Sequence, residues 1–258
     1  RASARETAMR VALGSIARKL LADLGIEVGS RVMSIGPAND ETPVPAGMSP
    51  KELNKAVDSS SVRCLDQQAA QAMVEVIDTA KESGDSVGGT FEVIATGLPY
   101  GLGSYTQWDL KLRSRLGEAI MSVNAIEGVE FGTGFGGGRL LGSAFHDEIM
   151  PEEQGPGLTR ASNNAGGMEG GVSNAQPLIL RAVMKPIPTL IKSLRSVDLA
   201  SGSAGSAHKE RTDACAVPAA AIVAESMVCL VTADALLEKF GGDSMDQVRA
   251  HMDASAHY

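Results

Sequence analysis

A long apolar run near the C-terminal end of the sequence limits the folds open to this chain. From Ala219 to Phe240 apolar residues occupy nearly every side of a helix, with Pro218 suited to the first turn and Gly241-Gly242 to the end. Such a helix has to be buried on most sides, so other elements must lie against it. A chain of 258 residues can supply that cover, since a domain of this size buries roughly 70–75% of its unfolded surface. The run therefore predicts a core helix inside a layered domain.

The other hydrophobic patterns predict helices and strands in an irregular order. Strands are expected at 26–35, 91–95, 129–131 and 178–184, and helices at 4–24, 65–83 and 108–121. In the first helix one apolar face is formed at three- and four-residue spacing by Met9, Leu13, Ile16, Leu20 and Leu24. Because the strands are short and no βαβ unit repeats, the sequence favours an α+β layer fold over a doubly wound sheet.

Composition and charge limit the class of partner. Lys and Arg number 23 against 31 Asp and Glu, a formal net charge of −8, which predicts neither nucleic acid nor an anionic membrane as a partner. No eighteen-residue apolar run and no secretory leader can be recognised, so no membrane span is expected. Cys64, Cys215 and Cys229 form no Cys-x-x-Cys pair and favour a reduced, cytoplasmic protein without a cysteine metal site.

The chain is expected to hold one catalytic-type domain over residues 1–242. The tail over 243–258 is either an extra helix or disordered. Arg1 is not preceded by Met and leads directly into a helix signal, so we expect a fragment of a longer chain.

The stretch SNNAGGMEGGVSNAQP, residues 162–177, is unusually dense in glycine. Glycine lacks a Cβ atom, so it permits positive φ and close approach to the backbone, at a cost of roughly 0.5–1 kcal/mol relative to alanine. The stretch is therefore either a set of tight turns or a ligand cradle.

A nucleotide-binding motif has to be weighed at Gly132, Gly134 and Gly137, which satisfy G-x-G-x-x-G after a predicted strand. That motif needs a long helix directly after it to receive the pyrophosphate, and the following RLLGSAFHDE is short and broken by Gly142. The sequence therefore disfavours a dinucleotide fold. The adjacent residues 146–148, His-Asp-Glu, share no face of a helix or strand and indicate a polar loop rather than a metal site.

Three sets of charged residues could serve a ligand or only the fold. Arg1 and Arg5 lie at the start of the first helix, where the helix dipole favours a phosphate or carboxylate, although the spacing alone favours ordinary capping with solvated arginines. Lys185 ends a predicted buried strand beside a proline-rich turn. It is either a functional group or a lysine whose ammonium reaches solvent. Arg211 and Asp213 precede the core helix. They form either a salt bridge with no further role or a cation and a carboxylate that contact a ligand.

Several stretches together resemble the chorismate synthase family, in the family's order. They are RASARETAMRVALGSIARKLL (1–21), GEAIMSVNAIEGVEFGTGF (117–135), SNNAGGMEGGVSNAQP (162–177), KPIPT (185–189) and ERTDACAVPAA (210–220). The resemblance covers nearly the whole chain except residues 36–62 and the tail after Gly242.

The resemblance implies a lyase of the shikimate pathway of aromatic amino acid biosynthesis. Enzymes of this family convert 5-enolpyruvylshikimate 3-phosphate to chorismate and phosphate by a 1,4-anti elimination that requires reduced FMN. Some members reduce their flavin with NADPH. The fold implied is a helical layer sandwiched between antiparallel sheets, in a cytoplasmic homotetramer that acts on a small anionic substrate.

The resemblance also implies roles for individual residues. Flavin contacts fall on Arg1, Ala2, Ser3, Asn124, Ala125, Gly170, Lys185, Pro186, Ile187, Pro188, Thr189 and Arg211. Asp213 matches the family's carboxylate near the flavin N5, a catalytic role, and Ser3 and Arg5 fall where substrate is held. No metal ligand is implied.

The sequence departs from the family at its histidines. The family's N-terminal third carries one functional histidine in G-E-S-H-G and another in G-H-A-D, and His146, His208, His251 and His257 match neither motif. The chain thus resembles the C-terminal two-thirds of the enzyme and lacks the general acid for the departing phosphate. A flavin-binding module or fragment without catalysis is the main alternative, and an NAD-dependent oxidoreductase is a weaker one.

Overall fold

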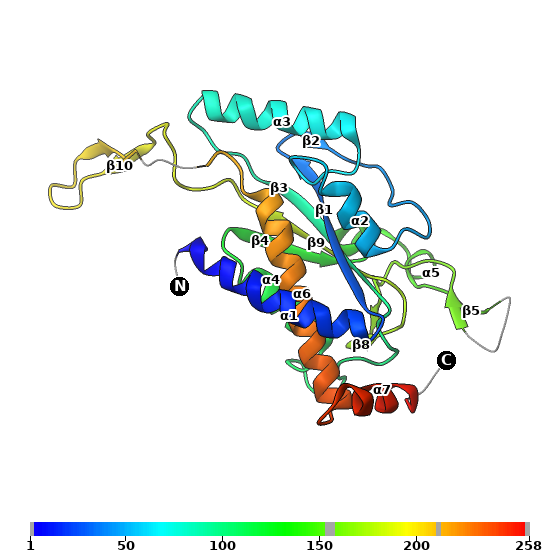
Figure 1. Cartoon of the computed structure of the whole chain (residues 1–258). Coiled ribbons are helices and arrows are strands. Elements are labelled where there is room, and N and C mark those ends of the chain that lie inside the picture. The colour runs from blue at the N-terminus through cyan, green and yellow to red at the C-terminus, as the bar shows by residue number, and fades with distance from the viewer. Residues whose placement is uncertain (1–2, 153–157, 210–212, 256–258) are drawn as a thin grey trace.

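The structure, a computed structural model, describes residues 3–152, 158–209 and 213–255 (Figure 1). Its helical elements are η1 (Ala4–Glu6), α1 (Thr7–Asp23), α2 (Pro50–Val57), α3 (Gln67–Glu82), α4 (Leu112–Met121), η2 (Gly134–Arg139), α5 (Gly142–Phe145), α6 (Val217–Phe240) and α7 (Met245–Asp253). Its strands are β1 (Glu27–Ile35), β2 (Ala38–Asn39), β3 (Gly89–Thr96), β4 (Ile126–Phe131), β5 (Ile149–Pro151), β6 (Leu158–Arg160), β7 (Met168–Glu169), β8 (Val172–Ser173), β9 (Leu178–Met184), β10 (Arg195–Val197) and β11 (Ala204–Ser206). The expected strands and the three expected helices are all present, with ends shifted by a few residues.

The main sheet has five strands in the order β2-β1-β3-β9-β4, and every neighbouring pair is antiparallel. One row of paired residues, Ile35, Gly89, Met184 and Ile126, marks one end of the sheet. A doubly wound fold would instead have parallel strands joined by crossover helices. The α+β prediction is therefore confirmed, and the arrangement excludes a dinucleotide-binding sheet in the described part of the chain.

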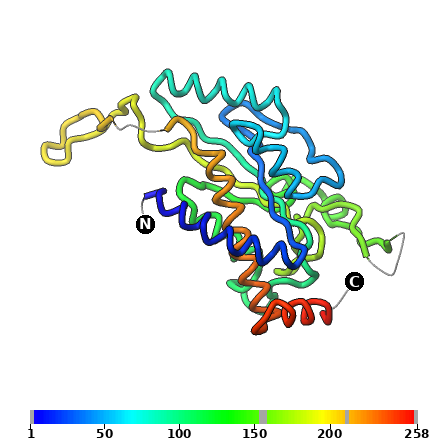
Figure 2. Tube along the Cα trace, viewed as in Figure 1, coloured from blue at the N-terminus to red at the C-terminus, as the bar shows by residue number. Residues whose placement is uncertain are grey.

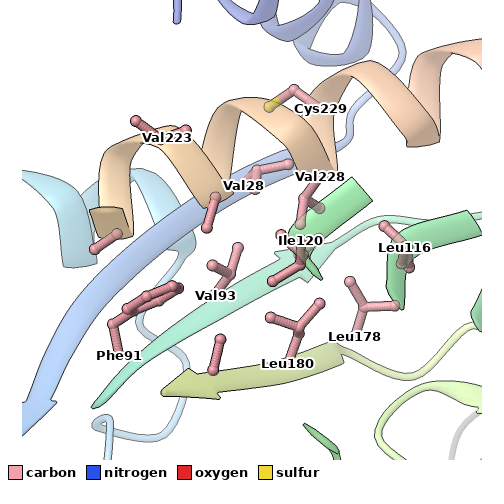
Figure 3. Packing of buried hydrophobic residues seen from close by; sticks show 14 of the residues in the cluster. Val28, Phe91, Val93, Leu116, Ile120, Leu178, Leu180, Val223, Val228 and Cys229 are labelled. Carbon is pink, nitrogen blue, oxygen red and sulfur yellow. The ribbon is translucent and has the colours of Figure 1, made fainter. Parts of the chain in front are cut away.

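One face of this sheet packs against α6. Alternate residues of β9, such as Leu178 and Leu180, are fully buried, because successive side chains of a strand point to opposite faces. Figure 3 shows Val93 and Leu180 from the sheet in the space beneath α6, which contributes Val228. Burial of each such side chain stabilises the fold by about 1.5–3 kcal/mol.

The core-helix prediction is confirmed by α6, which runs along the middle of the molecule (Figure 2). Fourteen of its 24 residues are buried, and it begins with Pro218 in the first turn and ends at Gly241. By length and composition α6 could cross a membrane, but 67% of its most apolar window is buried inside the protein, as in a core helix. A buried carboxylate, Glu225, is compensated by Ser30 and by ion pairs with arginines.

The first helix buries a different face from the one that its periodicity predicts. Met9, Leu13 and Ile16 are 64%, 53% and 67% exposed. The buried residues of α1 are instead Gly14, Ala17 and Leu21. Small residues let α1 approach α6 closely, and a Cβ on Gly14 would lie 2.5 Å from the Cβ of Ser226. An apolar stripe on α1 is therefore left facing outward.

Smaller elements surround this core. The structure adds α2, which the sequence did not predict and which is capped by Ser49 and Glu52 in a capping box. The β10–β11 hairpin projects away from the body (Figure 1). In the C-terminal tail α7 places Val248 in the core, so the helical alternative for the tail holds for residues 245–253.

Candidate functional site

Most of the described residues with an implied flavin role gather at one end of the main sheet, which we call the Lys185 end. It is formed by the start of β3, the end of β9 and the start of β4. The backbone N–H of Lys185 donates to the carbonyl of Ala125 at 2.9 Å, and the Ser86 hydroxyl donates to the carbonyl of Ile187 at 2.6 Å. Segments far apart in sequence are thereby held side by side.

The turn before β4 is strained at this end. Ala125 has φ of 65°, a left-handed conformation that costs a residue other than glycine roughly 1–2 kcal/mol. Its carbonyl is fixed by Lys185, and Asn124 precedes it in the same turn. Strain of this kind clusters at ligand sites, because the surrounding structure has to impose it.

Lys185 lies where β9 stops, because Pro186 has no N–H to continue the ladder. Its ammonium is 2.5 Å from a carboxylate oxygen of Glu127, and both side chains are about half exposed, at 50% and 53%. The cation is thus at the surface of the sheet end, within reach of a ligand. Beyond it Pro186 and Pro188 are exposed, while Ile187 and Thr189 are half-buried.

The start of α1 is tied to the same end. Arg10 donates to the hydroxyl and the carbonyl of Ser122, at 2.7 and 3.2 Å, two residues before Asn124. Ser3 and Arg5 lie up to two helical turns from Arg10, toward the N-terminus, and both are exposed. Asp213 is also exposed, and the adjacent Ala214 carbonyl accepts the N–H of Val87, just before β3. Arg1, Ala2 and Arg211 lie outside the described residues.

Gly170 is not brought to the Lys185 end. It lies at the tip of the β7–β8 hairpin, and the neighbouring Gly171 carbonyl accepts the N–H of Leu112 at the start of α4. Asn124 follows the other end of α4. Ten residues of helix, about 15 Å at 1.5 Å per residue, therefore separate the two places.

The glycine-rich stretch 162–177 mainly packs against its own chain. A Cβ on Gly166 would lie 2.3 Å from the backbone nitrogen of Gly132, and one on Gly167 would lie 2.6 Å from the carbonyl oxygen of Pro177. Gly171 is similarly close to Ser104, at 2.7 Å. Of these four paired glycines only Gly170 has open space around the position of a Cβ. Three of the four paired glycines are therefore required by internal packing, which is the tight-turn alternative.

Gly170 lines a cavity of about 620 Å³, which we call the Gly170 cavity. Its wall includes the start of α4 and the segment from α5 to β5, which lie next to the hairpin. The lining residues are Lys111, Arg113, Ser114, Phe145, His146, Asp147, Ala165, Met168, Glu169, Gly170 and Gly171.

Asp147 organises the wall of the Gly170 cavity, a role that the sequence did not reveal. Its carboxylate accepts hydrogen bonds from the Ser162 hydroxyl at 2.6 Å, from Asn164 N–H at 2.7 Å and from Ala165 N–H at 2.9 Å. Burial alone would raise the pKa of Asp147, but these hydrogen bonds and the charge of Arg160 lower it overall. Within the described residues no group of three His, Cys, Asp or Glu could hold a metal ion.

The G-x-G-x-x-G motif has a structural role in the described chain. Gly132 has φ of 58° and packs against Asn164, and the motif leads into the six-residue 3₁₀ helix η2 and the four-residue α5. Neither helix is long enough to receive a pyrophosphate in the way that the motif requires. The expectation against a dinucleotide fold is consistent with this geometry.

Together these features define an α+β protein with an all-antiparallel sheet, a buried central helix and a strained turn at one sheet end, rather than a doubly wound nucleotide-binding protein. The chain belongs to the chorismate synthase family, because the family model described as "Chorismate synthase" matches residues 1–237. The resemblance found in the sequence is thereby confirmed.

Individual relatives agree with this family. A chorismate synthase of Desulforamulus reducens is 53% identical over 253 residues, which cover 98% of this chain and 65% of that protein. The "Chorismate synthase 2" of Bacillus cereus is 48% identical over 258 residues, covering 100% of this chain and 65% of its own length. A solved structure titled "Crystal Structure of Chorismate Synthase" has a TM-score of 0.83 at 40% identity, over 98% of this chain and 69% of that one. The chain thus spans 65% of the length of these two relatives.

Proposed function

We propose that this chain is part of a chorismate synthase, a lyase that converts 5-enolpyruvylshikimate 3-phosphate to chorismate and phosphate in the shikimate pathway. The observation that carries the proposal is the Lys185 end of the sheet. There, segments that match the family in sequence are held together by Lys185, Ala125 and Ile187. Family membership over residues 1–237 supports the same reaction class.

Reduced FMN fits the groups at this end. The Lys185 ammonium can balance the negative charge of a phosphate. The fixed backbone around Ala125 and residues 185–189 can place its peptide groups against a flat ring. We propose Ser3, Asn124, Ala125 and the segment Lys185–Thr189 as its contacts, with Arg1, Ala2 and Arg211 outside the described residues. When bound, reduced flavin supplies electron density and a basic N5. Gly170 remains a prediction, since it lines a different cavity.

The chain's own residues would position and screen the reactants. Ser3 and Arg5 offer a hydroxyl and a guanidinium to an anionic substrate at the start of α1. Asp213 is proposed to hold a proton near the flavin N5. NADPH is proposed as a further reductant of the flavin.

The proposal extends to a cytoplasmic homotetramer. The outward apolar stripe Met9, Leu13 and Ile16 supports contact with further protein surface, because contiguous apolar patches mark interaction sites. The free thiols Cys64, Cys215 and Cys229 are consistent with a reducing compartment.

A second candidate is a flavin-binding unit without catalysis. The observation that favours it is the length of the chain, which is 65% of the two relatives described above. Such a unit would bind flavin, yet the shikimate ester would leave the flavin spectrum unchanged. An NAD-dependent oxidoreductase would instead bind nicotinamide without flavin.

The test is anaerobic phosphate release from 5-enolpyruvylshikimate 3-phosphate with chemically reduced FMN, for this chain and for a version extended upstream, with the flavin spectrum recorded in parallel. Release by either chain supports the lyase. Flavin binding without release by both chains favours the non-catalytic unit. Absence of flavin binding and of release in both would overturn the proposal.

A further inference from the structure

Arg10 on α1 connects three helices beside the turn that precedes β4. Its Nε and Nη2 atoms lie 3.0 and 2.9 Å from the carboxylate oxygens of Glu6, in a bidentate ion pair one helical turn apart. Its Nη1 donates to the Ser122 hydroxyl at 2.7 Å and lies 3.8 Å from the sulfur of Met227 on α6, and its Nη2 donates to the Ser122 carbonyl at 3.2 Å. Glu6 thus orients the guanidinium so that its far end meets Ser122.

Ser122 follows the last residue of α4, and Arg10 binds both of its polar groups. The Ser122 hydroxyl donates to the Ala119 carbonyl at 2.6 Å, so its oxygen is left to accept from Arg10. The last carbonyls of a helix have no partner within it, and a cation is favoured there by the helix dipole. Arg10 therefore fixes the position of the C-terminal end of α4 relative to α1.

The turn that carries two proposed flavin contacts follows this helix end directly. It is closed by the Ile126 N–H, which donates to the Val123 carbonyl at 3.2 Å. Its two central residues are Asn124 and Ala125, and Ala125 has the left-handed φ of 65° described above. Such a conformation persists only where the surrounding structure imposes it. The contacts on both sides of the turn therefore decide its shape.

The turn is held from two directions. Lys185 donates its backbone N–H to the Ala125 carbonyl and so fixes the side that leads into β4. Arg10 holds the other side through Ser122, which lies two residues before Asn124. Lys185 is itself proposed to contact the flavin, whereas Arg10 acts on the turn through another residue.

We infer that Arg10 is a positioning residue for the flavin, which holds the turn of Asn124 and Ala125 in its binding conformation through Ser122. This inference rests on the proposed function. When the contact is lost, the turn spends only part of its time in the competent shape, and the apparent affinity for FMN falls by that fraction.

The experiment titrates FMN into the full chain and its variants, with flavin fluorescence as the readout. Arg10→Met keeps an apolar stem and removes every donor, and Arg10→Lys keeps a cation. Ser122→Ala removes the accepting hydroxyl, and the double variant Arg10→Met with Ser122→Ala completes a cycle. Urea unfolding first establishes that each variant is folded at the temperature of the titration.

Arg115→Met is the matched control. Arg115 also ties α4 to α6, through ion pairs with Asp234 and, at 2.9 Å, with Glu238. Its side chain is 17% exposed, close to the 22% of Arg10. Its loss should lower the free energy of unfolding without disturbing the turn before β4.

We expect Arg10→Met to weaken FMN binding about tenfold, as when the turn is competent for about a tenth of the time. Arg10→Lys should recover part of this loss, and Arg115→Met should stay within about twofold of wild type. Ser122→Ala should weaken FMN binding about threefold, and the double variant should be no weaker than Arg10→Met, because both changes remove one contact.

Two outcomes would overturn the inference while the proposed function stands. One is wild-type FMN affinity in Arg10→Met, and the other is an equal loss in Arg115→Met. If Arg10→Met does not fold, Arg10→Lys and Ser122→Ala carry the test, and wild-type affinity in both would overturn the inference. Absence of FMN binding by the wild-type chain would overturn this inference together with the proposed flavin site.

Discussion

The Lys185 end of the main sheet and the Gly170 cavity are built in different ways. At the Lys185 end, segments distant in sequence meet through single backbone hydrogen bonds, and the strain falls on one alanine, Ala125. At the Gly170 cavity, a local glycine-rich hairpin packs mostly against neighbouring backbone and leaves open space only beside Gly170, in a cavity that Lys111 and Arg113 also line. A high density of glycine indicates that other atoms approach the backbone closely, and here those atoms belong largely to the protein itself.

The largest expected effect separates the two kinds of glycine within that hairpin region. Gly166→Ala should destabilise the chain by about 3 kcal/mol or more, because its Cβ would meet the Gly132 nitrogen at 2.3 Å in a left-handed conformation. Gly170→Ala, with open space and φ of 61°, should cost only about 1–2 kcal/mol. Urea unfolding of both variants measures the difference. Equal losses would contradict the assignment of Gly166 to packing.

A second prediction tests the wall of the Gly170 cavity. Asp147→Asn should lower the free energy of unfolding by about 2 kcal/mol at pH 7, since a buried anion with three donors is lost. The pKa of Asp147 is lowered in the folded state, so its contribution is present above the ordinary value of 3.8. It is lost as pH falls below 3.8 through the lowered pKa. Unfolding measured from pH 7 to pH 3 should show the two proteins converging, and a constant gap would contradict this.

A third prediction concerns the Lys185 end. Lys185→Gln should weaken FMN binding by about tenfold to a hundredfold, as expected for loss of one charge-assisted hydrogen bond of roughly 1.5–3 kcal/mol. Lys192→Gln is the control, since Lys192 also pairs with a carboxylate, Asp85, and is 59% exposed. Flavin fluorescence titration reads both. A similar loss in both variants would point to general charge rather than to a contact.

The smallest effect uses Cys215 as a probe beside the Lys185 end. Cys215 is half-buried two residues before α6, and burial raises the pKa of its thiol. Bound FMN should slow its alkylation severalfold. Burial raises the pKa of Cys64 to about 12 and that of Cys229 to about 11, so both should remain unreactive as internal controls. Mass spectrometry after timed labelling reports each thiol, and equal rates of Cys215 labelling with and without FMN would contradict the proposed position of the flavin.

The sequence predicts elements well where one signal dominates. The core helix α6 has an apolar run with a proline at its start and a glycine at its end, and β9 is an apolar run stopped by Pro186. The buried face of α1 could not be predicted, because two stripes compete and the close contact of Gly14 with Ser226 decides between them.

The candidate site was only partly predictable for a similar reason. Lys185 is marked by its place at a strand end, but its contact with Ala125 joins residues sixty positions apart. The partners of Asp147 lie 15 to 18 residues away in a loop that has no periodic pattern. Neither the cavity nor the separation of Gly170 from Asn124 can be derived before the fold is known.

The most direct test of this account measures FMN binding to two variants of the chain. FMN is titrated into the wild-type chain, Lys185→Gln and Lys111→Gln, with flavin fluorescence as the readout. We predict that Lys185→Gln weakens FMN binding and that Lys111→Gln, in the wall of the Gly170 cavity, leaves it unchanged. If Lys111→Gln weakened FMN binding as much as Lys185→Gln, the Gly170 cavity would belong to the flavin site and the Lys185 end would not hold the flavin by itself.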